Sequence, residues 1–358
     1  MDIVRSTFDY EAWLGRELAG DVVQKDLDKK HKKMKDSAFV FLRATYWRWA
    51  EIILGVCPEL SNAPAVLAVG DIHVENFGTW RDLDGRLVWG VNDFDEAAEM
   101  PFALDLVRLA VSAFLGRSGV SVALDAICEA ILEGYDKGLR APQPFVLDRD
   151  HRRMREIFVA SEDEREEFWN KMAEASNASV GPAGQRYFDA LLSAMPDPAV
   201  QMTVKPRTAG TGSLGRPRWV AIAEWKGGPV VREAKAVVQS GWDRARGRHG
   251  SQGAIGKLSD GRYRASDPWY RLDGENVLVR RLSPNSRKIE VAHNSEILLG
   301  GEMLKAMGRE LANVHLGVAD CGAEIRRDRQ DRADGWLAAA AGKAARAIES
   351  EFEQWRTR

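Results

Sequence analysis

The sequence predicts an α+β fold in which a small antiparallel sheet is inserted between two parts of a mainly helical body. In residues 39–53 and 301–316, apolar side chains recur at spacings of three and four, which is typical of amphipathic helices. Between about residues 200 and 290, short alternating stretches are separated by glycine turns, which is typical of antiparallel strands. The chain has 358 residues, and at about 100 to 200 residues per domain this length predicts two domains.

The part of the chain before the sheet is predicted to be helical, then briefly extended, then helical again. Ser37 can cap a helix over residues 39–53, and AVLAVG, from Ala65, reads as a short buried strand. FGTWRDL and RLVWGVND flank a turn at residues 84–85 and predict a hairpin. Helical spacing returns over residues 102–138.

The sheet and the C-terminal helices follow. The predicted strands are TVKPR, RPRWVAIAEW, PVVREAK and NVLVRRLSP. A helix begins at Gly301, and the charged residues 324–334 separate it from a last helix that ends near Trp355. The chain is thus divided into residues 1–145, with helices and polar motifs; 146–199, helical; 200–290, the sheet; and 291–358, helices that complete the helical body.

Composition narrows the classes of partner. Lys and Arg total 51 against 53 Asp and Glu, so the formal net charge is -2 and no strong field attracts nucleic acid or an anionic membrane. The apolar run ALDLVRLAVSAFL is interrupted by Asp105 and Arg108, and the N-terminus lacks a basic segment followed by an apolar core. We therefore expect neither a nucleic-acid partner nor a membrane partner.

The cysteines indicate a reducing compartment. Cys57, Cys128 and Cys321 are scattered and form no CxxC pair, which argues against a disulfide framework and against a zinc site. Reduced thiols fit the cytoplasm, which is the predicted location.

The densest group of polar residues is GDIHVENFG, residues 70–78, with Asp71, His73, Glu75 and Asn76 close together. In one interpretation, the Asp and Asn are turn residues that cap backbone N–H groups. In a second, Asp-x-His after a strand begins a two-metal phosphoesterase site, although no GHxH follows. In a third, the motif serves phosphoryl transfer from a nucleotide.

The third interpretation rests on spacing. Asp71 and Asn76 have the Asp-x-x-x-x-Asn spacing of a kinase catalytic loop. Asp93 follows at the end of the predicted hairpin, where a second metal ligand is expected. The role of His73 is open between proton transfer and packing against the metal-binding segment.

A glycine-rich segment, GTGSLG, lies between the first two predicted strands of the sheet. It contains Gly210, Thr211, Gly212, Ser213 and Gly215. A dinucleotide-binding loop would open a helix, whereas RPRWVAIAEW has the pattern of a strand, as after the glycine loop of a kinase. Residues without a Cβ let the backbone approach phosphates closely, so the segment fits ATP; a purely structural glycine turn is the alternative.

The next strand is expected to provide a cation for the phosphates. VVREAK offers Lys235, which we favour because a kinase cation usually acts as a compact ammonium, and Arg232 as the second candidate. Either residue could instead be a surface charge at a sheet edge.

These motifs together resemble a known superfamily. GDIHVENFG, VNDFDEA and PFALDLVRLA are similar to segments of aminoglycoside and choline phosphotransferases, and more similar still to the bacterial domain of unknown function numbered 2252. The resemblance implies a protein-kinase-like two-lobe fold that binds ATP and Mg²⁺. It implies that Asp71 is the catalytic base, that Asn76 and Asp93 are metal ligands with Asp95 as a further contact, and that Asp105 braces the catalytic loop.

The order of the motifs implies a circular permutation. In ordinary kinases the glycine loop precedes the catalytic loop, whereas here Gly210 follows Asp71. The helix from Gly301 resembles the LGxxLAxLH helix that normally precedes the catalytic loop. In this resemblance His315 is a packing residue, and the strand NVLVRRLSP leads into a hinge at residues 282–283 (Leu282 and Ser283), which would contact adenine.

The predicted function is ATP- and Mg²⁺-dependent transfer of the γ-phosphoryl group to a hydroxyl acceptor, either a small molecule or a protein. The alternatives are a nucleotide-binding pseudokinase, an AMP transferase on the same fold, and a metal-dependent phosphoesterase. The expected partners are a nucleotide and an acceptor. The sequence leaves open which acceptor is used and how many copies of the chain associate.

Overall fold

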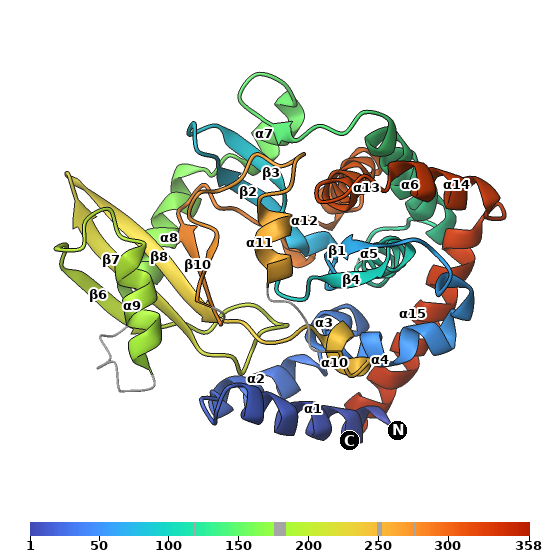
Figure 1. Ribbon diagram of the computed structural model, residues 1–358, viewed down its shortest axis with the longest axis horizontal. Coiled ribbons are helices and arrows are strands. Elements are labelled where there is room, and N and C mark those ends of the chain that lie inside the picture. The colour runs from blue at the N-terminus through green and yellow to red at the C-terminus, as the bar shows by residue number, and fades with distance from the viewer. Residues whose placement is uncertain (118, 175–183, 249–252, 275) are drawn as a thin grey trace.

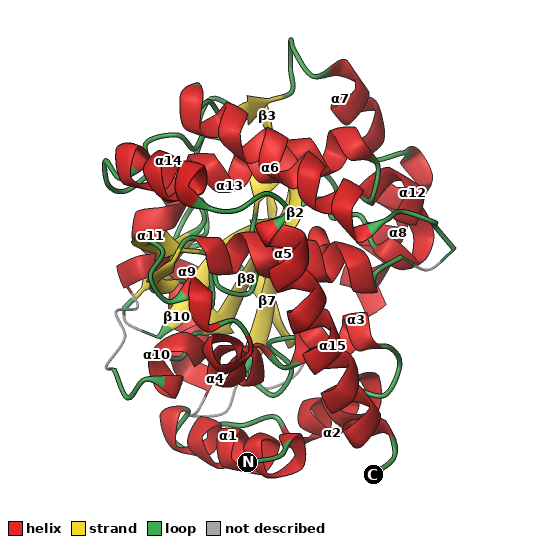
Figure 2. Cartoon of the chain, turned by 90° about the vertical axis from the view of Figure 1, so that its right-hand side faces the viewer, coloured by secondary structure: helices red, strands yellow, loops and turns green. Residues whose placement is uncertain are grey.

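The fold has a helical body with a five-stranded antiparallel sheet packed at one side of it (Figure 1). The structure is a computed structural model and describes residues 1–117, 119–174, 184–248, 253–274 and 276–358. Figure 2, seen from the helical side, shows the strands β7, β8 and β10 behind the helices of the body. The predicted α+β class, with a small antiparallel sheet, is confirmed.

The chain begins with four helices. They are α1 Ile3–Glu17, α2 Gln24–Lys33, α3 Ala38–Ala44 and α4 Tyr46–Val56. Ser37 caps α3 as predicted, because its side chain accepts a hydrogen bond from the Val40 N–H. The expected single helix over residues 39–53 is divided at Thr45, which has φ -123° and ψ 42° and whose hydroxyl donates to the carbonyl of Phe41. Such back-bonding offers the chain an alternative to the helical ladder.

Two small sheets surround the polar motif. β1 Ala65–Ala68 pairs with β4 Ala98–Pro101, and β2 Phe77–Arg81 pairs with β3 Leu87–Val91, which also pairs with β5 Phe145–Val146. The strand at residue 65 and the hairpin are therefore confirmed, and Gly85 takes the φ of +77° that the hairpin turn requires. The motif lies between β1 and β2, and the short turn η2 Val74–Asn76 is part of it.

The middle and the C-terminal end of the chain form the rest of the helical body. The predicted helical stretch over residues 102–138 consists of α5 Ala103–Leu115 and α6 Leu124–Arg140. α13 Gly301–Leu316 packs so closely on α6 that a Cβ at Gly134 would lie 1.9 Å from the carbonyl oxygen of Lys305. The charged segment expected between the last two helices is itself the helix α14 Gly322–Asp331, and α15 Trp336–Arg356 follows as predicted. The remaining elements are η1 Pro58–Leu60, α7 Arg152–Phe158, α8 Glu162–Glu174, α9 Gln185–Ser193, α10 Gly241–Ala245, α11 Gly253–Ser259 and α12 Val291–Leu298.

The five-stranded sheet has the order β6-β7-β8-β10-β9. Its strands are β6 Met202–Pro206, β7 Arg218–Trp225, β8 Gly228–Ala236, β9 Arg271–Asp273 and β10 Val277–Leu282. β9 was not predicted, because three residues are too few to show alternation. One face of the sheet packs against α9 through Ala221 and Ala234, which belong to the same apolar cluster as Tyr187 and Leu191. The other face carries Glu233 and Lys235 toward the polar motif.

The two ends of the chain lie near one another at the bottom of Figure 1. The Lys35 ammonium donates to the carbonyl oxygen of Arg358 at 3.1 Å, and α1 contacts α15. Cys57, Cys128 and Cys321 are buried free thiols, as expected. Within the described part of the chain, no helix combines the length and the apolar character needed to cross a membrane.

The buried Glu310 of α13 predicts an unusual dependence of stability on pH. Its side chain is 5% exposed, and burial raises its pKa to about 7, although Arg264 acts in the opposite direction. An unfolded glutamate titrates near about 4.3. The folded protein therefore binds the extra proton, and the free energy of unfolding decreases as the pH rises from about 4 to about 7.

Glu310→Gln is expected to remove this decrease and to stabilise the protein above pH 7 by about 1–3 kcal/mol. Urea unfolding at pH 5 and pH 8 measures the effect. Glu302→Gln, an exposed position on the same helix, is the control. An equal decrease in the variant and in the wild type would contradict the prediction.

Candidate active site

The loop after β1 is held by a buried carboxylate. Asp105 of α5 accepts the backbone N–H of Val69 at 2.8 Å and that of Gly70 at 3.0 Å. His315, at the end of α13, lies with its Nε2 3.1 Å from the same carboxylate, and its Nδ1 lies 2.7 Å from the Tyr135 hydroxyl. Because a carboxylate only accepts, Nε2 carries the proton and Nδ1 accepts from Tyr135. Asp105 thus braces the loop as expected, and His315 orients Asp105.

Asp105→Asn is expected to destabilise the protein by about 1–3 kcal/mol, because an amide cannot accept all three of these hydrogen bonds. Thermal or urea unfolding measures the change. Asp125→Asn, at an exposed position of α6, is the control and should have no effect. Equal stability of the Asp105 variant and the wild type would show that the brace is dispensable.

Asp71 is held by a buried arginine. One carboxylate oxygen of Asp71 pairs with Arg108 of α5, whose side chain is fully buried and also donates to the carbonyl of Leu42. The guanidinium lies 4.9 Å from the ring centroid of Tyr46. The Asp71 side chain itself is 19% exposed, so its orientation is fixed while its second oxygen stays accessible. In the sequence, Arg108 was noted only as a charge that interrupts an apolar run, and its contact with Asp71 was not predicted.

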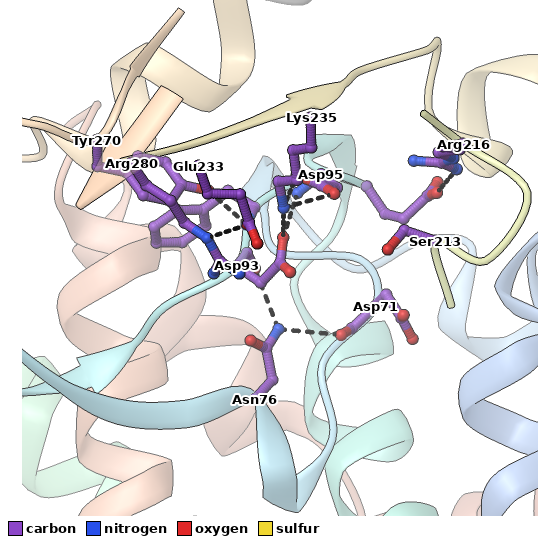
Figure 3. Close-up of polar contacts among 12 residues, drawn as sticks. Asp71, Asn76, Asp93, Asp95, Ser213, Arg216, Glu233, Lys235, Tyr270 and Arg280 are labelled. Carbon is purple, nitrogen blue, oxygen red and sulfur yellow. Dashed lines mark hydrogen bonds and ion pairs between the residues drawn. The ribbon is translucent and has the colours of Figure 1, made fainter. Parts of the chain in front are cut away.

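Asn76 and Asp93 come together below the sheet (Figure 3). The Asn76 amide donates to the carbonyl of Asp71 at 3.2 Å and to that of Asp93 at 3.0 Å. These bonds turn Oδ1 of Asn76 away from both carbonyls, and this buried oxygen has no hydrogen-bond partner among the described residues. The two residues that the spacing predicted as metal ligands are therefore neighbours, joined through the amide nitrogen of Asn76.

Lys235 links the sheet to this pair. Its ammonium lies 3.1 Å from Oδ1 of Asp93 and 2.7 Å from the carboxylate of Asp95, and its side chain is 1% exposed. Burial acts to raise the pKa of Asp93, but the charges of Lys235, Lys288 and Arg280 outweigh it and hold the pKa well below its usual range. Burial and the charge of Asp93 raise the pKa of Asp95.

The glycine loop covers the loop that carries Asp71. A Cβ at Gly212 would lie 3.2 Å from Oδ2 of Asp71 and 3.1 Å from the carbonyl oxygen of Arg43, so a side chain there would crowd both. Thr211, Ser213 and Gly210 line the same cavity, and Gly210 has a φ of +75°.

The N-terminal helices hold the glycine loop in place. The Lys30 ammonium donates to the carbonyl of Gly212 at 2.8 Å, and Thr208 donates to Asp26 at 2.9 Å. Gly215 has a φ of +98°, and a Cβ there would meet the Leu27 side chain at 2.3 Å. Gly215 is therefore needed for packing on α2, and it does not line the cavity.

His73 enters the cavity as a neutral imidazole. Burial, followed by the charges of Arg43, Lys288 and Arg108, lowers its pKa well below the usual value. Its side chain lines the cavity, and Nδ1 has no hydrogen-bond partner in the part of the chain that the structure describes. A neutral imidazole can accept a proton but does not supply an ionic contact to a phosphate.

Besides Gly215, three predicted contacts lie away from the cavity. Lys235 does not line it either, but its ammonium contacts Asp93 and Asp95, which do. Arg232 occupies the opposite face of β8 from Lys235, since residues three apart on a strand point to opposite sides. Its Nε donates to the carbonyl of Ala194 at 2.9 Å, and its guanidinium lies 4.1 Å from the ring centroid of Trp269. The prediction of Arg232 as a phosphate contact is therefore wrong, and the period of the strand could have excluded it.

The predicted hinge contact is also wrong. Leu282 packs in an apolar cluster with Val220, Val231 and the α8 residues Phe168 and Trp169. Ser283 closes a turn, in which its carbonyl accepts the Ser286 N–H at 2.9 Å, and neither residue lines the cavity. The strand β10 and the helical character of α8 were predicted, but the packing of α8 on this end of the sheet was not.

A group of arginines that the sequence did not single out lines the roof of the cavity. Glu233 is fully buried and pairs with Arg218 and Arg280 at 2.6 Å each, and also with Arg207. Burial alone would raise the pKa of Glu233, but Arg218, Arg280 and Arg207 hold it well below the usual range. Lys288, which follows β10, is exposed to the cavity and forms no ion pair with the described residues.

The cavity has a volume of about 670 Å³ and lies between the sheet and the helical body. It contains Asp71, Asn76, Asp93 and Asp95 together with the tip of the glycine loop. The polar motif and the glycine loop, which are far apart in the chain, thus share one cavity. Within the described residues, no group of three or more His, Cys, Asp or Glu side chains forms a metal site by itself.

Comparison with known proteins supports part of the sequence interpretation. No curated protein and no solved structure matches this chain. The family model described as an uncharacterized protein conserved in bacteria (DUF2252) matches residues 23–194, a range that contains the polar motif, Asp93 and Asp105 and ends before the glycine loop. The resemblance to this bacterial family is therefore confirmed for residues 23–194.

Proposed function

We propose that this protein is an ATP- and Mg²⁺-dependent transferase of the kinase-like type, which moves a phosphorus-containing group from the nucleotide to a hydroxyl acceptor. The observation that carries the proposal is the meeting of Asp71, Asn76 and Asp93 with Lys235 beneath a glycine loop. These are the parts that phosphoryl transfer requires: a residue that orients the acceptor, two metal ligands, a cation and a cradle for phosphates.

The sheet supports a kinase-like arrangement. The glycine loop joins its first two strands, β6 and β7, and Lys235 lies on the third, β8. Protein kinases have the same order, with a glycine-rich loop over the phosphates and a lysine on the third strand. In this proposal the sheet is the smaller lobe and the helical body is the larger one.

Two contacts support the circular permutation. His315 at the end of α13 orients Asp105, so a C-terminal helix supports a loop near the N-terminus. The two ends of the chain lie near one another, since the Arg358 guanidinium lies 5.1 Å from the ring centroid of Phe8 in the first helix. Nearby termini allow a chain to be rejoined and opened elsewhere without disturbing its core.

Mg²⁺ fits the residues that are present. It prefers oxygen ligands and is usually held by one or two carboxylates together with substrate phosphates. The unpartnered Oδ1 of Asn76 and the second oxygen of Asp93 would be the protein ligands. Asp95 is engaged by Lys235, so we assign it to the positioning of that lysine before any contact with metal. When bound, the metal would neutralise charge that develops on the phosphate oxygens.

Which phosphorus atom reacts depends on the direction in which the nucleotide lies. The γ-phosphoryl transfer predicted from the sequence requires the base to lie beneath the sheet, beside the segment that follows β10. AMP transfer requires the nucleotide to lie in the opposite direction, with its terminal phosphates beneath the sheet. The arginines around Glu233 favour this second candidate, because they occupy the place that the base would need.

Calorimetric titration with ATP, with and without Mg²⁺, tests the proposed function. We expect saturable, Mg²⁺-dependent binding that is lost in Gly212→Val, because a side chain at this position would crowd Asp71 and Arg43. Gly228→Val, at the first residue of β8 with open space around it and no positive φ, is the control. The absence of binding to the folded wild-type protein would contradict the proposal. Chromatographic identification of ADP or AMP as the product then separates the two reactions.

A further inference from the structure

The roof of the cavity carries more positive charge than its own acidic group can balance. Arg207, Arg218, Arg280 and Lys288 all line the cavity, and Glu233 is the carboxylate that pairs with the three arginines. The side chains of Arg218 and Arg280 are only 4% and 18% exposed. Gathering cations in a poorly hydrated place is costly unless an anion accompanies them.

The guanidinium groups of Arg207 and Arg280 also have N–H groups that can donate to a ligand. Besides their bonds to Glu233, the side chains of Arg207 and Arg280 make no hydrogen bond to the residues that the structure describes. Glu233 therefore fixes the position of the guanidinium groups while part of each planar fork faces the cavity. Such forks bind phosphate oxygens in pairs, which favours a phosphate group as the ligand.

A nucleotide base has little suitable surface in this place. The apolar part of the same sheet face, Val220, Val231 and Leu282, is already covered by Phe168 and Trp169 of α8. The larger apolar and aromatic residues that do line the cavity belong to the helical body; they are Phe39 and Val40 on α3, Leu115 on α5, Val291 on α12, and Tyr10, Tyr46 and Trp47 on α1 and α4. Beneath the sheet, where γ-phosphoryl transfer needs the base, the cavity offers arginines that suit phosphates. The surface that suits the base belongs to the helical body instead.

The proposed metal ligands lie between these two regions. Glu233 and Arg280 are cross-strand neighbours, two residues along the sheet from Lys235, which separates them from the lysine above Asp93 by about 7 Å. Arg218 is the cross-strand neighbour of Lys235, and its side chain reaches Glu233. A triphosphate chain can extend from the metal ligands toward the arginines. Its inner phosphate then lies beside Asn76, Asp93 and Asp71.

We propose that Arg207, Arg218, Arg280 and Lys288 form a pyrophosphate subsite, which binds the two terminal phosphates of ATP and places the α-phosphorus beside Asp71. This inference rests on the proposed function and selects AMP transfer within it. The acceptor oxygen forms a bond to the α-phosphorus, and the bond from that phosphorus to the oxygen bridging to the β-phosphorus breaks. Pyrophosphate leaves with the electron pair of that bond, and the proton of the acceptor hydroxyl passes to Asp71.

Calorimetric titration with three probes tests the subsite, each in the presence of Mg²⁺: ATP, AMP and inorganic pyrophosphate. The test variants are Arg280→Gln and Lys288→Met, and the second removes a charge that has no ion-pair partner among the described residues, so the fold should be kept. Arg149→Gln is the control, because the Arg149 side chain is 91% exposed and its ion pair is with the adjacent Asp150. Thermal unfolding confirms that each variant is folded.

We expect pyrophosphate to bind the wild-type protein, and each test variant to weaken the binding of ATP and of pyrophosphate about ten- to hundredfold, as for the loss of a hydrogen bond to a charged group. AMP should bind the variants and the wild type equally, since it lacks the terminal phosphates. If ATP binds but pyrophosphate does not, or if AMP binding weakens as much as ATP binding, the subsite is wrong and the proposed function still holds. If ATP does not bind at all, both are wrong. ADP as the nucleotide product would also overturn the subsite.

Discussion

Replacing Asp71 by asparagine is expected to abolish transfer while ATP binding is kept. The carboxylate is held by Arg108, and its second oxygen faces the glycine loop, where an acceptor hydroxyl would meet the nucleotide. Loss of a positioned proton acceptor usually costs about 10²–10⁴-fold in rate. The asparagine oxygen can still accept from Arg108, so the buried arginine keeps a partner and the loop its shape.

Consumption of ATP measures the rate, and calorimetry measures the binding. Asp36→Asn is the matched control, because Asp36 lines the same cavity at an exposed position. If the Asp71 variant keeps full activity in an assay in which the wild type is active, Asp71 does not act on the acceptor. If ATP binding is lost as well, the effect is on the nucleotide site and the assigned role is again wrong.

Replacing Asp93 by asparagine is expected to remove the Mg²⁺-dependent part of ATP binding. Asp93 is the only carboxylate among the residues that we assign as metal ligands, and hard cations such as Mg²⁺ depend on charged oxygen ligands. Loss of even an outer-shell partner of a metal site costs about 10–100-fold in affinity, so loss of the ligand itself should cost at least as much. The variant should retain the weaker binding that the wild type shows without Mg²⁺.

Titration of ATP at several Mg²⁺ concentrations measures this effect. Asp84→Asn, in the exposed turn of the neighbouring hairpin, is the control and should bind like the wild type. Since Asp93 also contacts Lys235, unfolding of the variant must be measured beside its binding. A folded variant that retains the full Mg²⁺ dependence would show that the metal is bound elsewhere or not at all.

These two experiments separate roles that the sequence could assign only by spacing. Asp71, Asn76 and Asp93 follow short strands at intervals that predicted a common site, and the structure brings them together. Gly212 was likewise identified from a motif, and it lies against Asp71. Local motifs could be read because each occupies a few consecutive residues, whose types reflect the chemistry that they serve.

Other features could be read only in part. The alternation of β8 was enough to place Glu233 and Lys235 on one face and Arg232 on the other, yet the resemblance to a family motif drew attention to Arg232. Leu282 was expected at the nucleotide because the resemblance to kinases implies a hinge beside the adenine after this strand. The covering of that end of the sheet by α8 depends on a contact between distant segments, which no local pattern contains.

By itself, the sequence determined the α+β class, the main helices and strands, the polar loop with Asp71 and Asn76, and the glycine loop, because these depend on periodicity, turn residues and short motifs. Only the tertiary structure decided which charges meet. It paired Asp71 with Arg108, joined Lys235 to Asp93 and gathered three arginines on Glu233. The partners in these pairs are between 15 and 142 residues apart, so chain folding alone sets their distances.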